Sequence, residues 1–231
     1  MLRSYSPTLA AFAAVLLAGG GLASALGDRL RRWPTWRRDS AVIVGATVLV
    51  SVISVGAGAI AIGEWPATKV SSIGRLVLGP LLIAVLDGPL GEEIGWRGLL
   101  LPLLLQRCTA IRASLLVGVV WFAWHLPLYA VDGRTLDAAF LLPYLIAVLA
   151  YSLIFTWLVR RAGGSIWVAV AAHTAINYSQ FALSTLFPSL GATQADRWAF
   201  IVAMVVLGSG AAFALRGGTD GALSLPQDNG R

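Results

Sequence analysis

The sequence contains few charged residues, two histidines and a single cysteine. Charged side chains make up 12% of the 231 residues and hydrophobic ones 58%, whereas about 25% of a soluble domain is charged. The lone Cys108 excludes an intrachain disulfide and a cysteine-built metal site. This composition excludes an ordinary soluble domain and predicts an integral membrane protein.

The apolar runs predict an all-α fold, a polytopic transmembrane helical bundle of about seven spans. The expected spans are 8–26, 41–62, 73–106, 113–130, 139–159, 165–187 and 198–215. The third segment is expected to be broken, because one straight helix of that length would measure about 51 Å against about 30 Å of hydrocarbon. The candidate break points are Gly79-Pro80, Asp87-Gly88-Pro89 and Pro102.

Four regions are expected along the chain. They are N-terminal transmembrane helices with an Arg-rich loop (1–72), a central core (73–187), a C-terminal transmembrane helix (188–216) and a polar, disordered tail (217–231). The first 26 residues resemble a cleavable signal peptide in pattern. The arginine cluster in 27–40 resists translocation, so we predict a retained first helix over 8–26 instead.

Most basic residues lie in short segments between the apolar runs. The net charge of +6 alone would fit nucleic-acid binding, but arginines in such segments are expected to meet lipid headgroups. If the spans alternate, the arginine-bearing segments share one side, which the positive-inside rule assigns to the cytoplasm. We therefore expect a plasma-membrane protein of bacterial type, with its N-terminus outside and its C-terminus cytoplasmic, that meets lipid and no nucleic acid.

A charged cluster interrupts one of the most apolar regions, in the stretch "GEEIGWRG" from Gly91 to Gly98. At about 100° per residue, Glu93 and Arg97 differ by roughly 40° around a helix, while Glu92 and Arg97 differ by roughly 140°. Arg97 is therefore expected to pair with Glu93. Glu92 is left to face another partner, and we expect it to be the carboxylate that transfers protons.

Both histidines lie within predicted spans. His125 closes "WFAWH", so Trp121 is expected one turn beneath it, and His173 opens "HTAIN", which places Asn177 on the same face. Counted at about 1.5 Å per residue from the nearest cytoplasmic arginine, Glu92, His125 and His173 lie roughly 22, 20 and 18 Å deep. Three segments distant in sequence are therefore expected to bring ionisable groups to one depth.

These residues also have purely structural interpretations. Glu93 and Arg97 can form an intramembrane ion pair, and His125 can be a packed, hydrogen-bonded histidine. Asn177 can join two helices, which is a common use of a buried amide in membranes. Intramembrane charges cost about 2.5–3.5 kcal/mol each, however, so the charged cluster as a whole favours a functional role.

Taken together, the polar residues resemble the CPBP intramembrane proteases, a family that includes the CAAX prenyl endopeptidases and bacteriocin-processing or self-immunity proteins. Three motifs on separate predicted spans carry the resemblance: Glu92-Glu93-x-x-x-Arg97, Trp121-x-x-x-His125 and His173-x-x-x-Asn177. The resemblance covers roughly residues 73–180 and keeps the motif order. Trp121 departs from the family, which usually has phenylalanine at this position.

The resemblance implies hydrolysis of a peptide bond inside the membrane, in a membrane-associated or prenylated-type polypeptide. It implies that Glu92 is the general base for a water that His125 helps to position, while His173 and Asn177 stabilise the oxyanion. The other two residues of the first motif would hold the geometry of Glu92. The use of a metal stays open, because Glu92, His125 and His173 form a known type of zinc ligand set, although no HExxH is present.

Other classes of protein stay open at this point. A transporter or proton relay would use the same buried groups to carry protons or bind a solute at mid-membrane depth. A noncatalytic immunity or adaptor protein would keep the fold and bind a partner through its spans. A bis-histidine haem protein is disfavoured, because it has no need of the charged residues in the first motif.

Overall fold

The computed structural model describes residues 2–18, 20–68, 73–133, 135–190 and 194–217, and the C-terminal tail expected to be disordered lies almost wholly outside them. Within these residues the chain is all-helical and has no strand, as predicted. The helices are η1 (Leu2–Tyr5), α1 (Ser6–Ala18), α2 (Gly20–Arg31), α3 (Trp36–Ile62), α4 (Ile73–Leu86), α5 (Pro89–Gly95), η2 (Trp96–Leu100), α6 (Leu101–Leu105), α7 (Ala110–Val131), α8 (Ala138–Arg161), α9 (Trp167–Leu186) and α10 (Ala195–Leu215).

Five of the helical segments are long and apolar enough to cross a membrane. They are Arg37–Ile62, Ile73–Leu105, Ala110–Val131, Ala138–Arg161 and Ala195–Leu215. α9 lies at the expected span 165–187, but it carries polar side chains that include His173 and Asn177, which lower its hydropathy. The predicted polytopic bundle is therefore confirmed.

The expected first span, 8–26, is not one continuous helix. α1 has 13 residues and ends at Ala18, and α2 has 12 residues and begins at Gly20. Neither helix alone reaches the about 20 residues that cross a bilayer. Gly19, between them, lies outside the described residues, and Gly20 and Gly21 are the first two residues of α2.

The third segment is broken, as predicted, at one of the three expected places. α4 ends at Leu86, and Gly88 has a φ of +117°, which is outside the range that other residues readily adopt. Pro89 then starts α5, where its missing N–H is not needed. η2 is one π-helical turn, in which the N–H of Leu101 donates to the carbonyl of Trp96. Such turns are frequent at functional sites.

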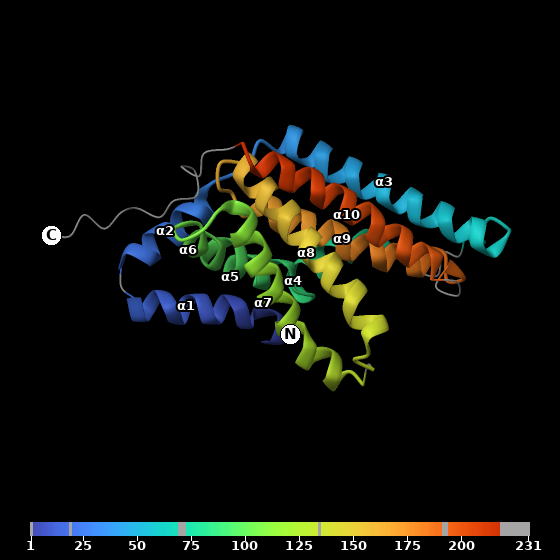
Figure 1. The fold of residues 1–231 in the computed structure, drawn as a ribbon, viewed down its shortest axis with the longest axis horizontal. Coiled ribbons are helices and arrows are strands. Elements are labelled where there is room, and N and C mark those ends of the chain that lie inside the picture. Colours follow the sequence, from blue (N-terminus) through green and yellow to red (C-terminus); the bar gives the residue numbers. More distant parts are fainter. Residues whose placement is uncertain (1, 19, 69–72, 134, 191–193, 218–231) are drawn as a thin grey trace.

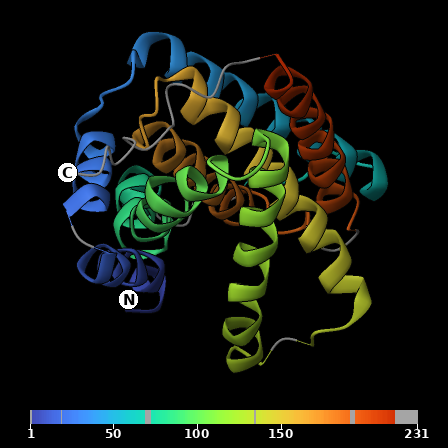
Figure 2. The ribbon, with the colours of Figure 1, turned by 60° about the vertical axis from the view of Figure 1, so that its left-hand side comes forward.

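The helices pack around a centre made by α7, α8 and α9. Val117, Phe155 and Val168, one from each of these helices, are fully buried there. α3 and α10 contact each other along their length, and they lie side by side in Figure 1. α1 and α2 lie on one side of the bundle and α10 on the opposite side (Figure 2). The outer faces of α3, α4 and α10 expose large apolar side chains, as expected of helices that face hydrocarbon.

The N-terminal helix contacts the helix that carries the first motif. A Cβ atom added to Gly95 would lie 2.5 Å from the backbone carbonyl of Pro7, so only glycine permits this approach. The hydroxyl of Thr8 donates a hydrogen bond to the carbonyl of Gly91. Small residues on α5 therefore let α1 pack directly against it, as small residues do between membrane helices.

Candidate active site

The first motif lies on α5 and η2, and its charged residues are almost completely buried. The exposed fraction is 3% for Glu92 and 0% for both Glu93 and Arg97. Arg97 Nη1 donates to Glu93 Oε1 at 3.0 Å, which is the pairing expected from the spacing of four residues. Because a buried charge is tolerated only when it is paired, this ion pair is part of what keeps the segment folded.

The guanidinium of Arg97 is held by more than its carboxylate partner. Its Cζ lies 4.7 Å from the centre of the Trp121 ring and 4.9 Å from that of Phe155. Its Nη2 lies 3.4 Å from Ser152 Oγ, and Ser152 in turn donates to the carbonyl of Ser114 at 2.6 Å. These contacts join η2 to α7 and α8, and the sequence analysis found neither serine nor Phe155.

Glu93 has a second partner that the sequence did not indicate. His173 Nδ1 lies 2.9 Å from Glu93 Oε1, the same oxygen that accepts from Arg97. Since a carboxylate oxygen accepts, Nδ1 carries the proton and the ring presents Nε2 as its other nitrogen. Glu93 therefore fixes the orientation of a histidine on α9 as well as that of Arg97.

Glu92 faces away from Arg97, as predicted, and its partner is Trp121. The indole Nε1 of Trp121 donates to Glu92 Oε2 at 2.6 Å. The sequence analysis placed Trp121 only beneath His125, where the two rings indeed lie 6.0 Å apart. A phenylalanine at this position would have no N–H to donate, so the departure from the family pattern adds a hydrogen bond to the motif glutamate.

His125 lies among aromatic rings of α7 and α8. Its Nδ1 donates to the carbonyl of Trp121 at 2.9 Å, which leaves Nε2 as the second ring nitrogen. Its ring centre lies 4.7 Å from that of Trp124, 5.9 Å from Tyr129 and 5.8 Å from Tyr144. These neighbours fix the His125 ring in one orientation. The sequence analysis did not identify the two tyrosines.

One cavity of about 570 Å³ brings four of the six predicted site residues together: Glu92, His125, His173 and Asn177 line it. Among the described residues the Asn177 amide has no hydrogen-bond partner, and it is half-buried at the cavity wall. Glu93 and Arg97 lie behind the wall, where they hold the lining residues. The expectation that separate spans bring their polar groups to one place is therefore met.

The N-terminal segment also reaches this cavity, which no feature of the sequence indicated. Ser4 lines the cavity. Ser6 Oγ accepts from Trp124 Nε1 at 2.9 Å, and the hydroxyl of Tyr5 donates to the carbonyl of Val85 at 2.7 Å. The start of α1 thus closes the site between α4 and α7.

The arrangement does not fit the alternative zinc site. Among the described residues, no three His, Cys, Asp or Glu side chains are grouped closely enough to hold a metal ion. We therefore derive no chemical step through a metal.

The part of the chain that carries these residues matches a known protein family. Residues 74–179 match the family described as Type II CAAX prenyl endopeptidase Rce1-like. The chain is also 32% identical over 107 residues to the CAAX prenyl protease 2 of Methanococcus maripaludis, an alignment that covers 44% of this chain and 40% of that protein. These matches confirm the resemblance predicted from the three motifs, and with the apolar helices they support an integral membrane protein.

Proposed function

We propose that this chain is an intramembrane endopeptidase, from the premise that residues 74–179 fit the CPBP family. One observation carries the proposal: Glu92, His125, His173 and Asn177 come from three separate helical segments and line one cavity. A volume of about 570 Å³ lies within the about 300–1,000 Å³ typical of ligand pockets. The substrate would be a membrane-associated or prenylated-type polypeptide, and residues 73–187 would form the catalytic core.

Glu92 is the proposed general base. A water held between Glu92 and Nε2 of His125 gives a proton to the carboxylate as its oxygen bonds to the scissile carbonyl carbon. The electron pair of the C=O bond moves to the carbonyl oxygen, which becomes the oxyanion. When that pair returns and the C–N bond breaks, Glu92 gives its proton to the leaving amide nitrogen. Trp121 would hold Glu92 Oε2 in place through these steps, since its N–H donates to that oxygen.

His173 and Asn177 are the proposed oxyanion donors. Because Nδ1 of His173 donates to Glu93, donation from Nε2 requires the doubly protonated ring. In that form the buried charges of His173 and Arg97 balance those of Glu92 and Glu93, and the group of four is neutral. Buried charges are tolerated when opposite charges pair with them.

We also propose that the arginine-bearing ends of the helices face the cytoplasm. Arg160 and Arg161 end α8, Arg216 follows α10, and Arg37 and Arg38 lie in the first turn of α3. This arrangement follows the positive-inside rule for a plasma membrane of bacterial type, with a cytoplasmic C-terminus. An N-terminus toward the outside requires in addition that α1 and α2 together cross the membrane. Reporters fused after Arg38 or Arg161 should read cytoplasmic, and one inserted near Gly133 should read external.

The function is tested by comparing the peptides of membranes that hold the intact protein or Glu92→Ala. A polypeptide fragment should accumulate only with the intact protein. Glu64→Gln is the matched control, because it removes an exposed carboxylate outside the cavity and should leave the fragment unchanged. The same set of fragments with all three proteins, at equal expression, would contradict the proposal.

A further inference from the structure

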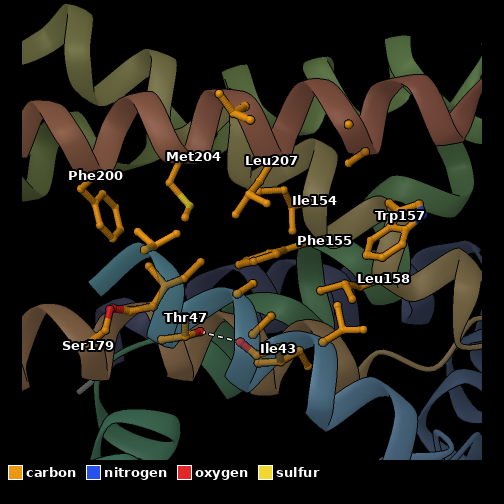
Figure 3. Close-up of a pocket in the computed structure, with 18 of the residues that line it drawn as sticks. Ile43, Thr47, Ile154, Phe155, Trp157, Leu158, Ser179, Phe200, Met204 and Leu207 are labelled. Carbon is orange, nitrogen blue, oxygen red and sulfur yellow. Dashed lines mark hydrogen bonds between the residues drawn. The ribbon is translucent and has the colours of Figure 1, made fainter. Parts of the chain in front are cut away.

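Another cavity, of about 320 Å³, lies between α3, α8, α9 and α10, and Phe155 and Ile176 separate it from the site described above. Figure 3 shows its walls, with Phe200, Met204 and Leu207 of α10 facing Ile43 of α3 and Phe155 of α8. It is about twice the volume of a cavity of about 150 Å³ that holds a benzene molecule. Nothing in the proposed peptidase chemistry uses it.

The interior of this cavity is almost wholly apolar. Its two hydroxyl groups are both bonded within their own helices. Thr47 donates to the carbonyl of Ile43 at 2.8 Å, the bond drawn in Figure 3, and Ser179 donates to the carbonyl of Ile176 at 2.7 Å. A ligand that fills this space must therefore be a hydrocarbon chain or ring.

The cavity is elongated along the bundle and reaches the outer surface. On α10 its lining residues run from Phe200 to Ala214, a distance of about 21 Å along a helix. Val206, which also lines it, is 65% exposed on a face made of apolar side chains. An extended chain can therefore enter from the hydrocarbon that surrounds α3 and α10.

Arginines surround one end of the cavity. The helix ends are held together there, because Arg161 Nε lies 3.6 Å from Asp39 Oδ1 and Arg160 Nη1 donates to the carbonyl of Leu215 at 3.3 Å. Trp157, a lining residue, lies 5.4 Å beneath the Arg161 guanidinium. Exposed arginines at the same helix ends complete the group: Arg37, Arg38 and Arg216.

We propose that this cavity binds one anionic phospholipid of the bilayer, with an acyl chain between α3 and α10 and its phosphate at the arginine end. The apolar interior can hold an acyl chain, and arginines are the residues that best recognise phosphate. Basic pockets between membrane helices on the cytoplasmic side bind anionic headgroups in this way. Lipid binding of this kind does not depend on the proposed peptidase function.

Substitutions that fill the cavity test whether an acyl chain occupies it. Gly210 lines it, and a Cβ added there would meet no atom within 4 Å, so Gly210→Leu adds a side chain at the cavity wall whose first atom meets no neighbour. Gly45→Leu is the matched control, because Gly45 on α3 has equally open surroundings but does not line the cavity. Ala46→Leu, on the facing wall, is made in parallel.

The readout is the lipid that the purified full-length protein retains, measured by native mass spectrometry. The protein is equilibrated with phosphatidylglycerol and phosphatidylcholine of identical acyl chains. We expect one retained phosphatidylglycerol per chain with the intact protein and Gly45→Leu, and about tenfold less with Gly210→Leu and Ala46→Leu, equivalent to about 1.4 kcal/mol. Equal retention by all four proteins, or none by the intact one, would overturn the acyl site.

The headgroup is tested separately. Arg38→Gln with Arg216→Gln should remove the preference for phosphatidylglycerol, whereas Arg107→Gln, which changes an exposed arginine at another helix end, should keep it. Equal binding of both lipids by the intact protein would overturn the arginine contact. If Gly210→Leu keeps its phospholipid but no longer cleaves lipid-modified peptides, the cavity holds the anchor of a substrate, and the proposal is wrong.

Discussion

Two cavities of this molecule share a wall and differ in almost everything else. Phe155 and Ile176 line both. On one side of them, about 570 Å³ is lined by carboxylate, imidazole and amide groups. On the other side, about 320 Å³ is lined almost wholly by hydrocarbon. One bundle thus keeps a reactive polar space and a dry apolar space one side chain apart.

The difference lies in how each cavity is stabilised. At the polar cavity the carboxylates of the first motif have specific partners: Glu93, behind the wall, bonds both Arg97 and His173, and Glu92 bonds Trp121. Removing one partner leaves another buried group unpaired, which costs several kcal/mol. In the apolar cavity the contacts are many, weak and without direction. Single substitutions should therefore change stability or activity strongly at the polar cavity and weakly at the apolar cavity.

Glu92→Gln should have the largest effect on activity. The amide keeps the shape of the side chain, and its oxygen can still accept from Trp121, but it cannot take a proton from water. We expect turnover to fall by about 10²–10⁴-fold, the usual contribution of a general base, with little change in Tm. Unchanged turnover by the purified, folded variant would remove Glu92 from the proposed mechanism.

Arg97→Ala should have the largest effect on stability. It leaves Glu93 as a buried charge whose remaining partner is His173, and it opens a space between the rings of Trp121 and Phe155. Breaking a buried pair in this way costs about 3–5 kcal/mol. Thermal unfolding in detergent measures the change. A variant with the Tm and turnover of the intact protein would show that the pair stabilises neither the fold nor the site.

The sequence predicted the parts of the molecule that depend on local spacing. The apolar segments, the break at Gly88 and the pairing of Glu93 with Arg97 all follow from helix geometry within one segment. The contact between Trp121 and Glu92 could not be predicted, because it depends on how α7 is rotated relative to α5. The first span was expected from the length of its apolar run, and that length does not show where one helix ends and the next begins.

The apolar cavity was equally invisible in the sequence. Its lining residues come from four helices and are the same types that fill any membrane-protein core. Charged residues in apolar runs stand out because they are costly, whereas a space left between apolar side chains has no counterpart in composition or spacing. The wall of Ser4 and Tyr5 beside the active-site cavity was missed for a similar reason, since short polar residues before a helix have many uses.

Trp121→Phe tests the hydrogen bond that sets this chain apart from the usual family pattern. The ring stays, so packing on Arg97 is kept, but the donor to Glu92 is lost. Hydrogen bonds to charged groups contribute about 1.5–3 kcal/mol, so we expect kcat to fall by about 10 to 150-fold. Trp124→Phe is the matched control, because it removes an indole donor to Ser6 from the same helix. Equal effects of both variants would contradict a specific role for the bond to Glu92.

Ile176→Val should have the smallest effect, and it tests whether the shared wall keeps the two cavities independent. The change removes one methylene from a side chain that faces both spaces. We expect a loss of about 0.5–1.5 kcal/mol in the free energy of unfolding, as for other buried methylenes. Turnover should stay unchanged, because no bond of Glu92, His125 or His173 passes through Ile176. Ile43→Val provides the comparison, since Ile43 lines only the apolar cavity and packs in the same core. A drop in turnover with Ile176→Val but not with Ile43→Val, at equal loss of stability, would show that the wall transmits packing changes from the apolar cavity to the proposed catalytic groups.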